Sequence, residues 1–412
     1  MKTKAAILRG TNQDWDVVDI EVDDPKTGEV VVEWMAAGLC HSDEHMITGD
    51  MVPPEEAWES LGIDNLWPMI GGHEGAGVIA AVGPGVSSVE VGDHVSASFI
   101  PSCGRCRYCS TGRQNLCDAS GGTFRKGMIT DETSRHRLED GTELNMLAKL
   151  GTFAHHTCVA ESQVIKVEKD LPLEAVALVS CGVATGFGSA TERGNVQAGD
   201  TVVVVGTGGI GMNAVQGAKV AGARHVIAID PIEFKREKAM EFGATHVFAS
   251  MEEAFPQVQE MTWGHMADKV IMTPGVLYGD MMQLGTGLAG KGGTIVVTGI
   301  APITQTESSV NLFELAMWNK EIKGTIFGSL NPRADIPRLL GMYREGQLKL
   351  DELITKTYSL DQVGEASLAV HHNEADGKLG VLCLAPSEGL GISDPEKRER
   401  IGEDKITVFR SA

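Results

Sequence analysis

The chain has 412 residues, of which 42% are apolar and 22% are charged, as in a globular protein of two or three domains. Its formal net charge of −21 argues against a nucleic acid or an anionic membrane as a partner. The beginning, MKTKAAIL, lacks the apolar core of a signal peptide, and no apolar run reaches membrane-spanning length. We therefore expect a cytoplasmic protein whose eight cysteines are not a disulfide scaffold.

The first 170 residues predict a β-rich unit, because short apolar runs alternate with glycine and proline. Strands are expected at 30–36, 77–82 and 94–100, which suggests a barrel-like domain. From about residue 171 helices and strands alternate, which is typical of a doubly wound α/β unit. Its predicted strands are 201–205, 225–229, 245–249, 269–272 and 294–298. A helix at 336–345 and a strand at 380–384 are expected beyond it.

Two stretches stand apart from this pattern. Residues 46–69 hold two prolines and two tryptophans, and we expect an elaborated loop with a short helix. Residues 387–412 form a charged tail, interpreted as a solvated or partner-covering extension.

Four cysteines crowd into fifteen positions with the spacing C-x2-C-x2-C-x7-C. They are Cys103, Cys106, Cys109 and Cys117. Four thiolates so close in sequence can surround one tetrahedral zinc ion without closing a long loop. Because a shell of four cysteines leaves no open position, we predict a structural zinc site.

A second set of metal-binding side chains is dispersed along the chain. Cys40 lies in GLCHSDEH, His73 in GGHEGAG and Cys181 in VSCGVATGFG. Two thiolates and one imidazole, with a fourth position open, are the pattern of a catalytic zinc site. Spacing alone does not show that these three residues meet.

A dinucleotide site is predicted at residues 201–230. Four consecutive valines, typical of a strand buried on both faces, lead into Gly206, Gly208 and Gly211. These glycines allow a tight turn, a close approach to a pyrophosphate, and close packing of helix on strand, respectively. Asp230 ends the next apolar run and can accept hydrogen bonds from a ribose diol, while it would repel a phosphate there. The cofactor predicted is NAD rather than NADP.

Taken together and in order, these motifs resemble those of the zinc-dependent alcohol dehydrogenases of the medium-chain dehydrogenase/reductase superfamily, up to about residue 384. The resemblance implies a GroES-like β-barrel catalytic domain made of residues 1–182 and 325–412, and a Rossmann NAD-binding domain at 183–324. It also implies two zinc ions per subunit, NAD(H), interconversion of alcohols, primary ones in particular, with aldehydes, and a homodimer or homotetramer.

The same resemblance assigns roles to single residues. Cys40, His73 and Cys181 would hold the catalytic zinc, with Glu74 beside it and Asp43 fixing the His73 ring. Ser42 would take the proton of the substrate hydroxyl, and His45 would pass it to solvent. The other residues it implies are His41, Thr185, Gly209, Ile210 and Lys235 on the cofactor, and Phe99, Phe153 and Ile300 in the substrate pocket.

Some features depart from the family pattern. His41 stands where many members carry an arginine on the pyrophosphate, and DGKLGVL (376–382) lacks the usual arginine. The long span from His45 to His73 and the charged tail resemble an actinobacterial subgroup that keeps NAD(H) bound and passes hydride to an external acceptor. Cys158 and Cys383 belong to neither zinc site and are expected to be core thiols.

Three other functions compete with this one. A thiol-adduct formaldehyde dehydrogenase would need a cationic anchor, which segment 46–69 could supply. A zinc-free quinone reductase of the same superfamily is disfavoured by the two cysteine sites. A catalytically silent NAD-binding protein is disfavoured because no predicted zinc ligand is missing.

Overall fold

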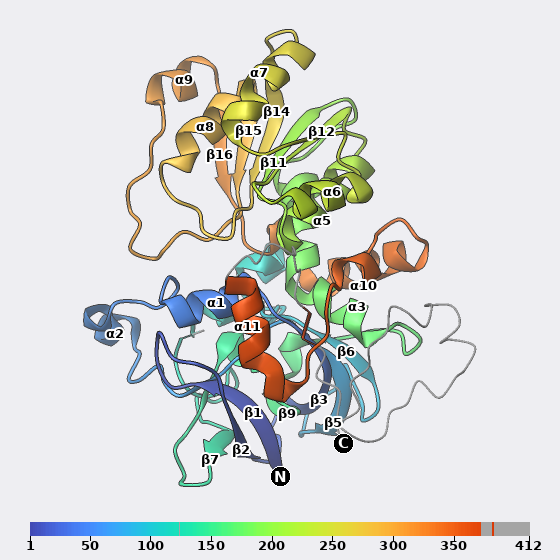
Figure 1. Cartoon of the computed structure of the whole chain (residues 1–412). Helices are drawn as coiled ribbons and strands as arrows, with labels where there is room; N and C mark the ends of the chain where they lie inside the picture. Colours follow the sequence, from blue (N-terminus) through green and yellow to red (C-terminus); the bar gives the residue numbers. More distant parts are fainter. Residues whose placement is uncertain (123, 372–380, 383–412) are drawn as a thin grey trace.

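A computed structural model describes residues 1–122, 124–371 and 381–382 and confirms the predicted fold class, a β-rich part beside a parallel-sheet part (Figure 1). The predictions for Cys383, for the tail at 387–412 and for most of DGKLGVL fall outside the described residues.

The β-rich part contains two sheets. The first has the strand order β7-β2-β1-β4-β8, formed by His136–Leu138, Asp16–Val22, Lys2–Leu8, Met69–Ile70 and Asn145–Met146. The second has the order β10-β6-β5-β3-β17, with β9 also paired to β3; these strands are Val164–Lys166, His94–Ala97, Ala76–Val82, Glu29–Gly38, Val381–Leu382 and His156–Ala160. Every pair in this second sheet is antiparallel.

The parallel-sheet part (residues 201–324) has the strand order β13-β12-β11-β14-β15-β16, and all its pairs are parallel. Its strands, in that order, are His246–Phe248, His225–Ile229, Thr201–Val205, Ala267–Met272, Ala289–Val297 and Glu321–Gly324. Its helices are α5 (Gly209–Val220), α6 (Glu233–Phe242), α7 (Met251–Met261), α8 (Met281–Leu288) and α9 (Leu312–Met317).

The four valines of β11 explain how this sheet is buried. Val202 and Val204 pack into one core with α5, while Val203 and Val205 pack into another with α7 and α8. Because successive side chains of a strand point to opposite faces, an unbroken apolar run fits a strand with helices on both sides. The predicted doubly wound arrangement is therefore confirmed.

One long apolar helical segment, Leu173–Arg193, connects the two parts. It consists of α3 (Leu173–Leu178), a wide π-helical turn (Val179–Val183), α4 (Ala184–Gly188) and a second π-helical turn (Ser189–Arg193). In the described part of the chain it is the one helix long and apolar enough to cross a membrane, and 83% of its most apolar window is buried inside the protein. A side chain at Gly186 would lie 2.0 Å from the Ile210 carbonyl oxygen, so glycine allows this segment to pack closely on α5.

Segment 46–69 has the predicted short helix, α2 (Glu55–Leu61), after the end of α1 (His41–Thr48). After the parallel sheet, α10 (Pro332–Arg344) and α11 (Val363–His371) return the chain to the β-rich part, where α11 lies beside α1 (Figure 1). Ser367 Oγ donates to Glu44 Oε2 at 2.9 Å across this contact. Short 3-10 turns complete the described structure at Cys109–Thr111, Gln114–Leu116, Asp118–Gly122, Leu147–Lys149, Glu161–Gln163, Phe327–Ser329, Asp351–Leu353 and Leu360–Gln362.

Candidate functional site

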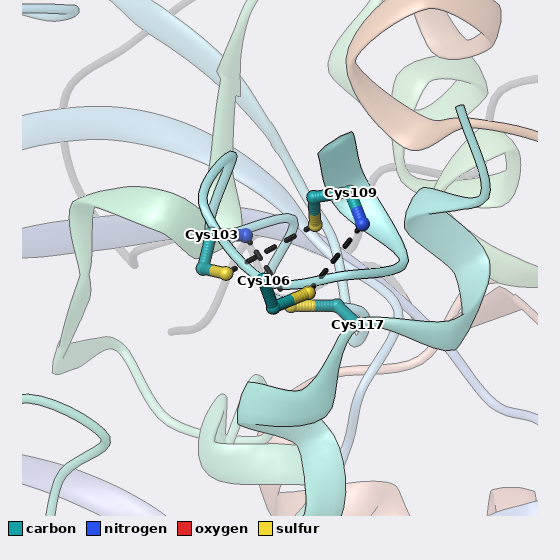
Figure 2. Close-up of side chains that lie close together, drawn as sticks. All are labelled: Cys103, Cys106, Cys109 and Cys117. Atoms are coloured by element: carbon teal, nitrogen blue, oxygen red, sulfur yellow. Dashed lines mark hydrogen bonds between the residues drawn. The ribbon is translucent and has the colours of Figure 1, made fainter. Parts of the chain in front are cut away.

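The four-cysteine loop folds into one compact cluster (Figure 2). The sulfur atoms of Cys103, Cys106, Cys109 and Cys117 all lie within 4.8 Å of one another. Two of them accept backbone N–H groups of the loop itself, Cys106 Sγ from Cys109 N at 3.4 Å and Cys117 Sγ from Cys103 N at 3.3 Å. The first of these bonds is the main cause that lowers the pKa of Cys106 to about 6. Four sulfur donors held this closely fit a closed tetrahedral zinc site.

The dispersed set also comes together, which spacing could not show. One ligand atom each from Cys40, His73, Glu74 and Cys181 lies within 4.8 Å of the others. Cys40 precedes α1, His73 and Glu74 lie between β4 and β5, and Cys181 lies in the first π-helical turn. His73, Glu74 and Cys181 are each at most 6% exposed. Two sulfurs, an imidazole and a carboxylate in one buried place fit zinc by the chemistry of the donor set.

Asp43 organises two of the segments that meet in this cluster. Its Oδ1 lies 3.4 Å from His73 Nδ1 and accepts Gly72 N at 3.1 Å, while Oδ2 accepts Cys40 N at 3.0 Å. Burial alone would lower the pKa of His73, but the Asp43 carboxylate outweighs it and raises that pKa well above its usual range. A ring whose Nδ1 is engaged by a carboxylate has Nε2 free for a metal.

Two side chains of this cluster, Glu74 and Cys40, have strongly shifted pKa values. Burial, followed by the negative charge on Cys40, raises the pKa of Glu74 to about 8. The pKa of Cys40 is lowered by its hydrogen bond with Cys181 and by His73, against the effect of burial. Glu74 Oε1 accepts Gly182 N at 3.1 Å, directly after Cys181 in the chain. Carboxyl groups and thiols with such strongly shifted pKa values are typical of functional sites.

The glycine loop has the geometry that the sequence predicted. Gly206 has φ +84°, and a side chain there would lie 2.7 Å from Pro274, whereas one at Gly211 would lie 1.9 Å from the Gly206 carbonyl oxygen. Gly208 has no atom within 4 Å of its missing side chain, so its backbone faces open space just before α5 begins at Gly209. An uncovered backbone at a helix N-terminus fits a dinucleotide pyrophosphate.

Asp230 lies at the carboxyl end of β12, beside that loop. Its Oδ2 accepts Thr207 N at 2.8 Å and its Oδ1 accepts Ile232 N at 3.0 Å, which fixes the carboxylate across two strand ends. Arg236 donates to the carbonyl oxygens of Asp230 and Pro231, a contact that sequence reasoning missed. Lys235, which was predicted to contact the ribose, lies next to it on α6.

Helix α1 carries Ser42 and His45 away from the metal cluster toward the parallel-sheet part. Ser42 Oγ lies 3.7 Å from Cys40 Sγ. His45 Nε2 contacts the Gly275 carbonyl oxygen at 3.0 Å, and Nδ1 contacts Asp50 Oδ2 at 3.2 Å. A side chain at Gly275 would also lie 2.7 Å from His41 Nε2. Asp50 was not predicted, because its partner is set by the turn that follows α1.

The remaining predicted residues lie at different depths. The Phe99 ring meets His73 edge-on at 6.0 Å and Phe327 at 5.5 Å. Phe153 is fully buried and packs edge-on against Trp15 at 5.4 Å. Thr185 is buried in α4, while Ile210 and Ile300 are half-buried. The structure thus places Phe99 at the metal cluster and Phe153 in a core.

Comparison with known proteins decides the family. A family model of zinc-binding dehydrogenases matches residues 209–345, and a model of the alcohol dehydrogenase GroES-like domain matches residues 26–169. An NDMA-dependent alcohol dehydrogenase of Amycolatopsis methanolica is 49% identical over 379 residues, 92% of this chain and 97% of that protein. This chain belongs to the zinc-dependent alcohol dehydrogenases. The similarity to an NDMA-dependent member supports the predicted branch.

Two further relatives of this alcohol dehydrogenase share less of its sequence. An S-(hydroxymethyl)glutathione dehydrogenase of Paracoccus denitrificans is 35% identical over 389 residues, 91% of this chain and 98% of that protein. The solved structure of benzyl alcohol dehydrogenase from Acinetobacter calcoaceticus superposes with a TM-score of 0.81 at 28% identity, covering 93% of this chain and 100% of that one. The enzyme therefore acts on small alcohols and aldehydes, with zinc and NAD, and the silent-protein and quinone-reductase alternatives are wrong.

Proposed function

We propose that this alcohol dehydrogenase oxidises primary alcohols with NAD(H) that stays bound through the cycle, and that it passes the hydride to an external acceptor. The observation that carries the proposal is the 49% identity to an NDMA-dependent alcohol dehydrogenase along nearly the whole of both chains. The long segment 46–69, folded with its own helix α2, supports the same assignment.

We assign the zinc-binding roles from the two clusters. Cys103, Cys106, Cys109 and Cys117 would hold the structural ion, and Cys40, His73 and Cys181 the catalytic one. Glu74 is the fourth group at the catalytic site, and Asp43 positions His73 and the Cys40 backbone. The division into residues 1–182 with 325–412 and residues 183–324 is our domain proposal.

The proton and the cofactor are handled by residues of both parts. Zinc, when bound, would polarise the alcohol hydroxyl, and NAD would supply the hydride acceptor. Ser42, at the metal cluster, takes the hydroxyl proton, and His45, one helical turn further along α1, passes it outward. The cofactor is held by Gly206, Gly208, Gly209, Ile210, Gly211 and Asp230, with Thr185, Lys235 and His41 around it. Phe99 and Ile300 would form the apolar side of the alcohol site, and Phe153, which was expected there, would support it from the core.

We further propose that subunits pair through the edge of the parallel sheet. Strand β16 ends the sheet, and its Ile322 is 38% exposed. On the adjacent α9, Leu312 and Phe313 are 73% and 70% exposed, so apolar surface continues beside the free strand edge. A second subunit that extends the sheet would satisfy this edge and cover the apolar side chains. Either a homodimer or a homotetramer, in the cytoplasm, is consistent with this proposal.

A direct test measures turnover of short primary alcohols by the protein as purified, with a nitrosoaniline dye as hydride acceptor, with and without added NAD. Turnover without added NAD is the expected result, together with NAD(H) recovered after denaturation of the protein. Turnover that requires added NAD, with NADH appearing in solution, would show an ordinary dissociating enzyme and contradict the proposal.

A second candidate, a thiol-adduct formaldehyde dehydrogenase, is favoured by one observation. Arg125 lies against the end of α2, where its Nε donates to the Leu61 carbonyl oxygen, so a cation does stand at segment 46–69. Such a cation could anchor an anionic thiol adduct. Formaldehyde oxidation that appears only when a low-molecular-weight thiol is added, and that is lost in Arg125→Ala, would favour this candidate over the first.

A further inference from the structure

The turn after α1 brings Asp50 back against His45. Gly49 ends the helix with φ +87°, and its N–H and that of Met51 both bond the His45 carbonyl oxygen. This reversal places Asp50 Oδ2 3.2 Å from His45 Nδ1, and Thr48 Oγ1 donates to the same oxygen at 2.8 Å. The carboxylate is therefore held by the turn itself, on a histidine that is only 1% exposed.

The opposite side of the His45 ring contacts the parallel-sheet part. Nε2 lies 3.0 Å from the carbonyl oxygen of Gly275, in the loop after β14. A carboxylate and a carbonyl can only accept hydrogen bonds, so the ring satisfies both when each of its nitrogens carries hydrogen. Asp50 therefore holds the His45 ring in the orientation that spans from the β-rich part to the parallel-sheet part.

The backbone of Asp50 makes a second link to the parallel-sheet part. Its carbonyl oxygen accepts Ile303 N, in the loop after β15, at 2.7 Å. The two loops are joined to each other, because Leu277 N donates to the Ile300 carbonyl oxygen at 2.9 Å. They are also joined to the glycine loop, where Thr273 Oγ1 donates to the Gly206 carbonyl oxygen at 2.6 Å. One residue of segment 46–69 thus connects α1 to the structure that borders the nucleotide site.

We propose that Asp50 is a positioning residue with two effects: it fixes the His45 ring for proton transfer, and it fastens the β-rich part to the loops that border the nucleotide site. We call the contacts of Asp50 and His45 with Gly275 and Ile303 the clasp. The effect on proton transfer rests on the function proposed above for His45. The effect on cofactor retention rests on the contacts to the two loops. The clasp thus assigns a function to Asp50, near the beginning of segment 46–69.

The test uses a graded series at one position, in the full-length zinc-loaded enzyme. Asp50→Asn keeps an oxygen that can accept from His45 but loses the charge, and Asp50→Ala loses both, while the backbone bond to Ile303 remains in each. We expect kcat to fall about tenfold or more in Asp50→Ala, with a smaller fall in Asp50→Asn and little change in the KM for alcohol. We expect the release rate of NAD, measured by exchange against labelled NAD, to rise in the same order.

Two controls separate this role from a general structural one. Asp64→Ala removes an exposed carboxylate from the same segment and should leave both quantities unchanged. Adding Asp50→Ala to His45→Ala should lower kcat no further, because Asp50 acts on catalysis through that ring. If kcat or NAD release in Asp50→Ala stays within twofold of the wild-type value, or if the double variant loses the full product of both effects, the proposal is wrong.

Failure of the proposed function gives a different result. A protein purified without NAD would refute permanent binding, yet the release rate of added NAD could still be compared across the same variants by stopped flow. The clasp and the bound cofactor are therefore tested separately.

Discussion

The carboxylate of Glu74 occupies the space that a side chain at Gly38 would need. A Cβ atom added to Gly38 would lie 1.9 Å from Glu74 Oε2 and 3.0 Å from its carboxyl carbon. Gly38 ends β3, two residues before Cys40, so the strand that leads to the Cys40 thiol leaves room for the Glu74 carboxylate beside that thiol. The cluster of Cys40, His73, Glu74 and Cys181 therefore depends on the missing side chain at Gly38 as well as on its own donor groups.

Gly38→Ala should therefore damage the catalytic cluster. The Glu74 carboxylate must move, which breaks its bond with Gly182 N and shifts the position beside Cys181. We expect kcat/KM for alcohols to fall by about tenfold or more, because even small displacements of catalytic groups lower the rate of an enzyme strongly. Steady-state kinetics would measure it. Gly341→Ala, where a side chain meets open space on α10, is the control and should change nothing.

A single substitution in each of the two cysteine clusters should affect different properties of the enzyme. Cys40→Ala should abolish turnover and remove one of two zinc ions per chain, while the melting temperature changes little. Cys103→Ala should remove the other ion and mainly lower the melting temperature, because a structural zinc shell contributes directly to folding. Metal analysis together with thermal unfolding would test both. Full activity in Cys40→Ala would refute the assignment of the catalytic ligands.

His136 should make the folded protein sensitive to acid. Burial lowers its pKa to about 3, and Nε2 accepts the Cys158 backbone N–H at 3.0 Å, which requires an unprotonated nitrogen. Because the unfolded chain takes up a proton near pH 6.5 and the folded chain does not, stability falls as pH drops below 6.5, by up to about 1.4 kcal/mol per pH unit.

The measurement for His136 is urea unfolding between pH 7.5 and pH 5. His136→Gln keeps an acceptor for Cys158 N but does not titrate, so its stability should fall less steeply than that of the wild type. His265→Gln, at an exposed position, should keep the wild-type slope. Equal slopes in His136→Gln and the wild type would show that His136 is not buried in its neutral form.

Lys149 should cost stability at neutral pH. Its Nζ has no hydrogen-bond partner among the described residues, and burial, with a smaller effect of Arg125, lowers its pKa to about 8. Since the charged form is disfavoured in the folded state, this cost is present below pH 8 and disappears as pH rises toward 10.5. Lys149→Met should stabilise the protein at pH 7 by as much as about 3 kcal/mol, since one pKa unit corresponds to about 1.4 kcal/mol.

Chemical unfolding at pH 7 and pH 10 would test the prediction for Lys149. The advantage of Lys149→Met should shrink at the higher pH, and the exposed Lys291→Met should show no advantage at either. A less stable Lys149→Met would mean that the ammonium group has an anionic partner in solution.

Features that depend on neighbouring residues were predictable from sequence. The four cysteines, the strand that leads into Gly206, and Asp230 at the end of the next strand are each set by local backbone geometry. The family resemblance supplied the dispersed zinc set, which spacing alone left open. The contact of Asp50 with His45 was missed because it needs the left-handed turn at Gly49, whose direction the sequence pattern does not specify.

Long-range polar pairs were also beyond sequence reasoning. Glu29 and Arg135 form a fully buried ion pair in which Nε and Nη2 of the arginine each donate to one carboxylate oxygen, although the residues are 106 positions apart. Such a pair forms only when the two sheets of the β-rich part pack so that the start of β3 lies beside the segment before β7, and composition does not reveal it. The π-helical turn that carries Cys181 is likewise invisible in the apolar pattern of its segment.

The close packing of Gly186 on the Ile210 carbonyl oxygen joins the helical segment that carries Cys181 firmly to the start of α5, where the glycine loop ends. Cys181, a proposed metal ligand, lies five residues before Gly186 in the same helical segment, so we expect any movement of Cys181 to shift the start of α5. The distance between an alcohol at the proposed zinc site and the cofactor at the glycine loop is therefore set by this packing. We expect preference for new alcohols to evolve through side chains outside this helical segment.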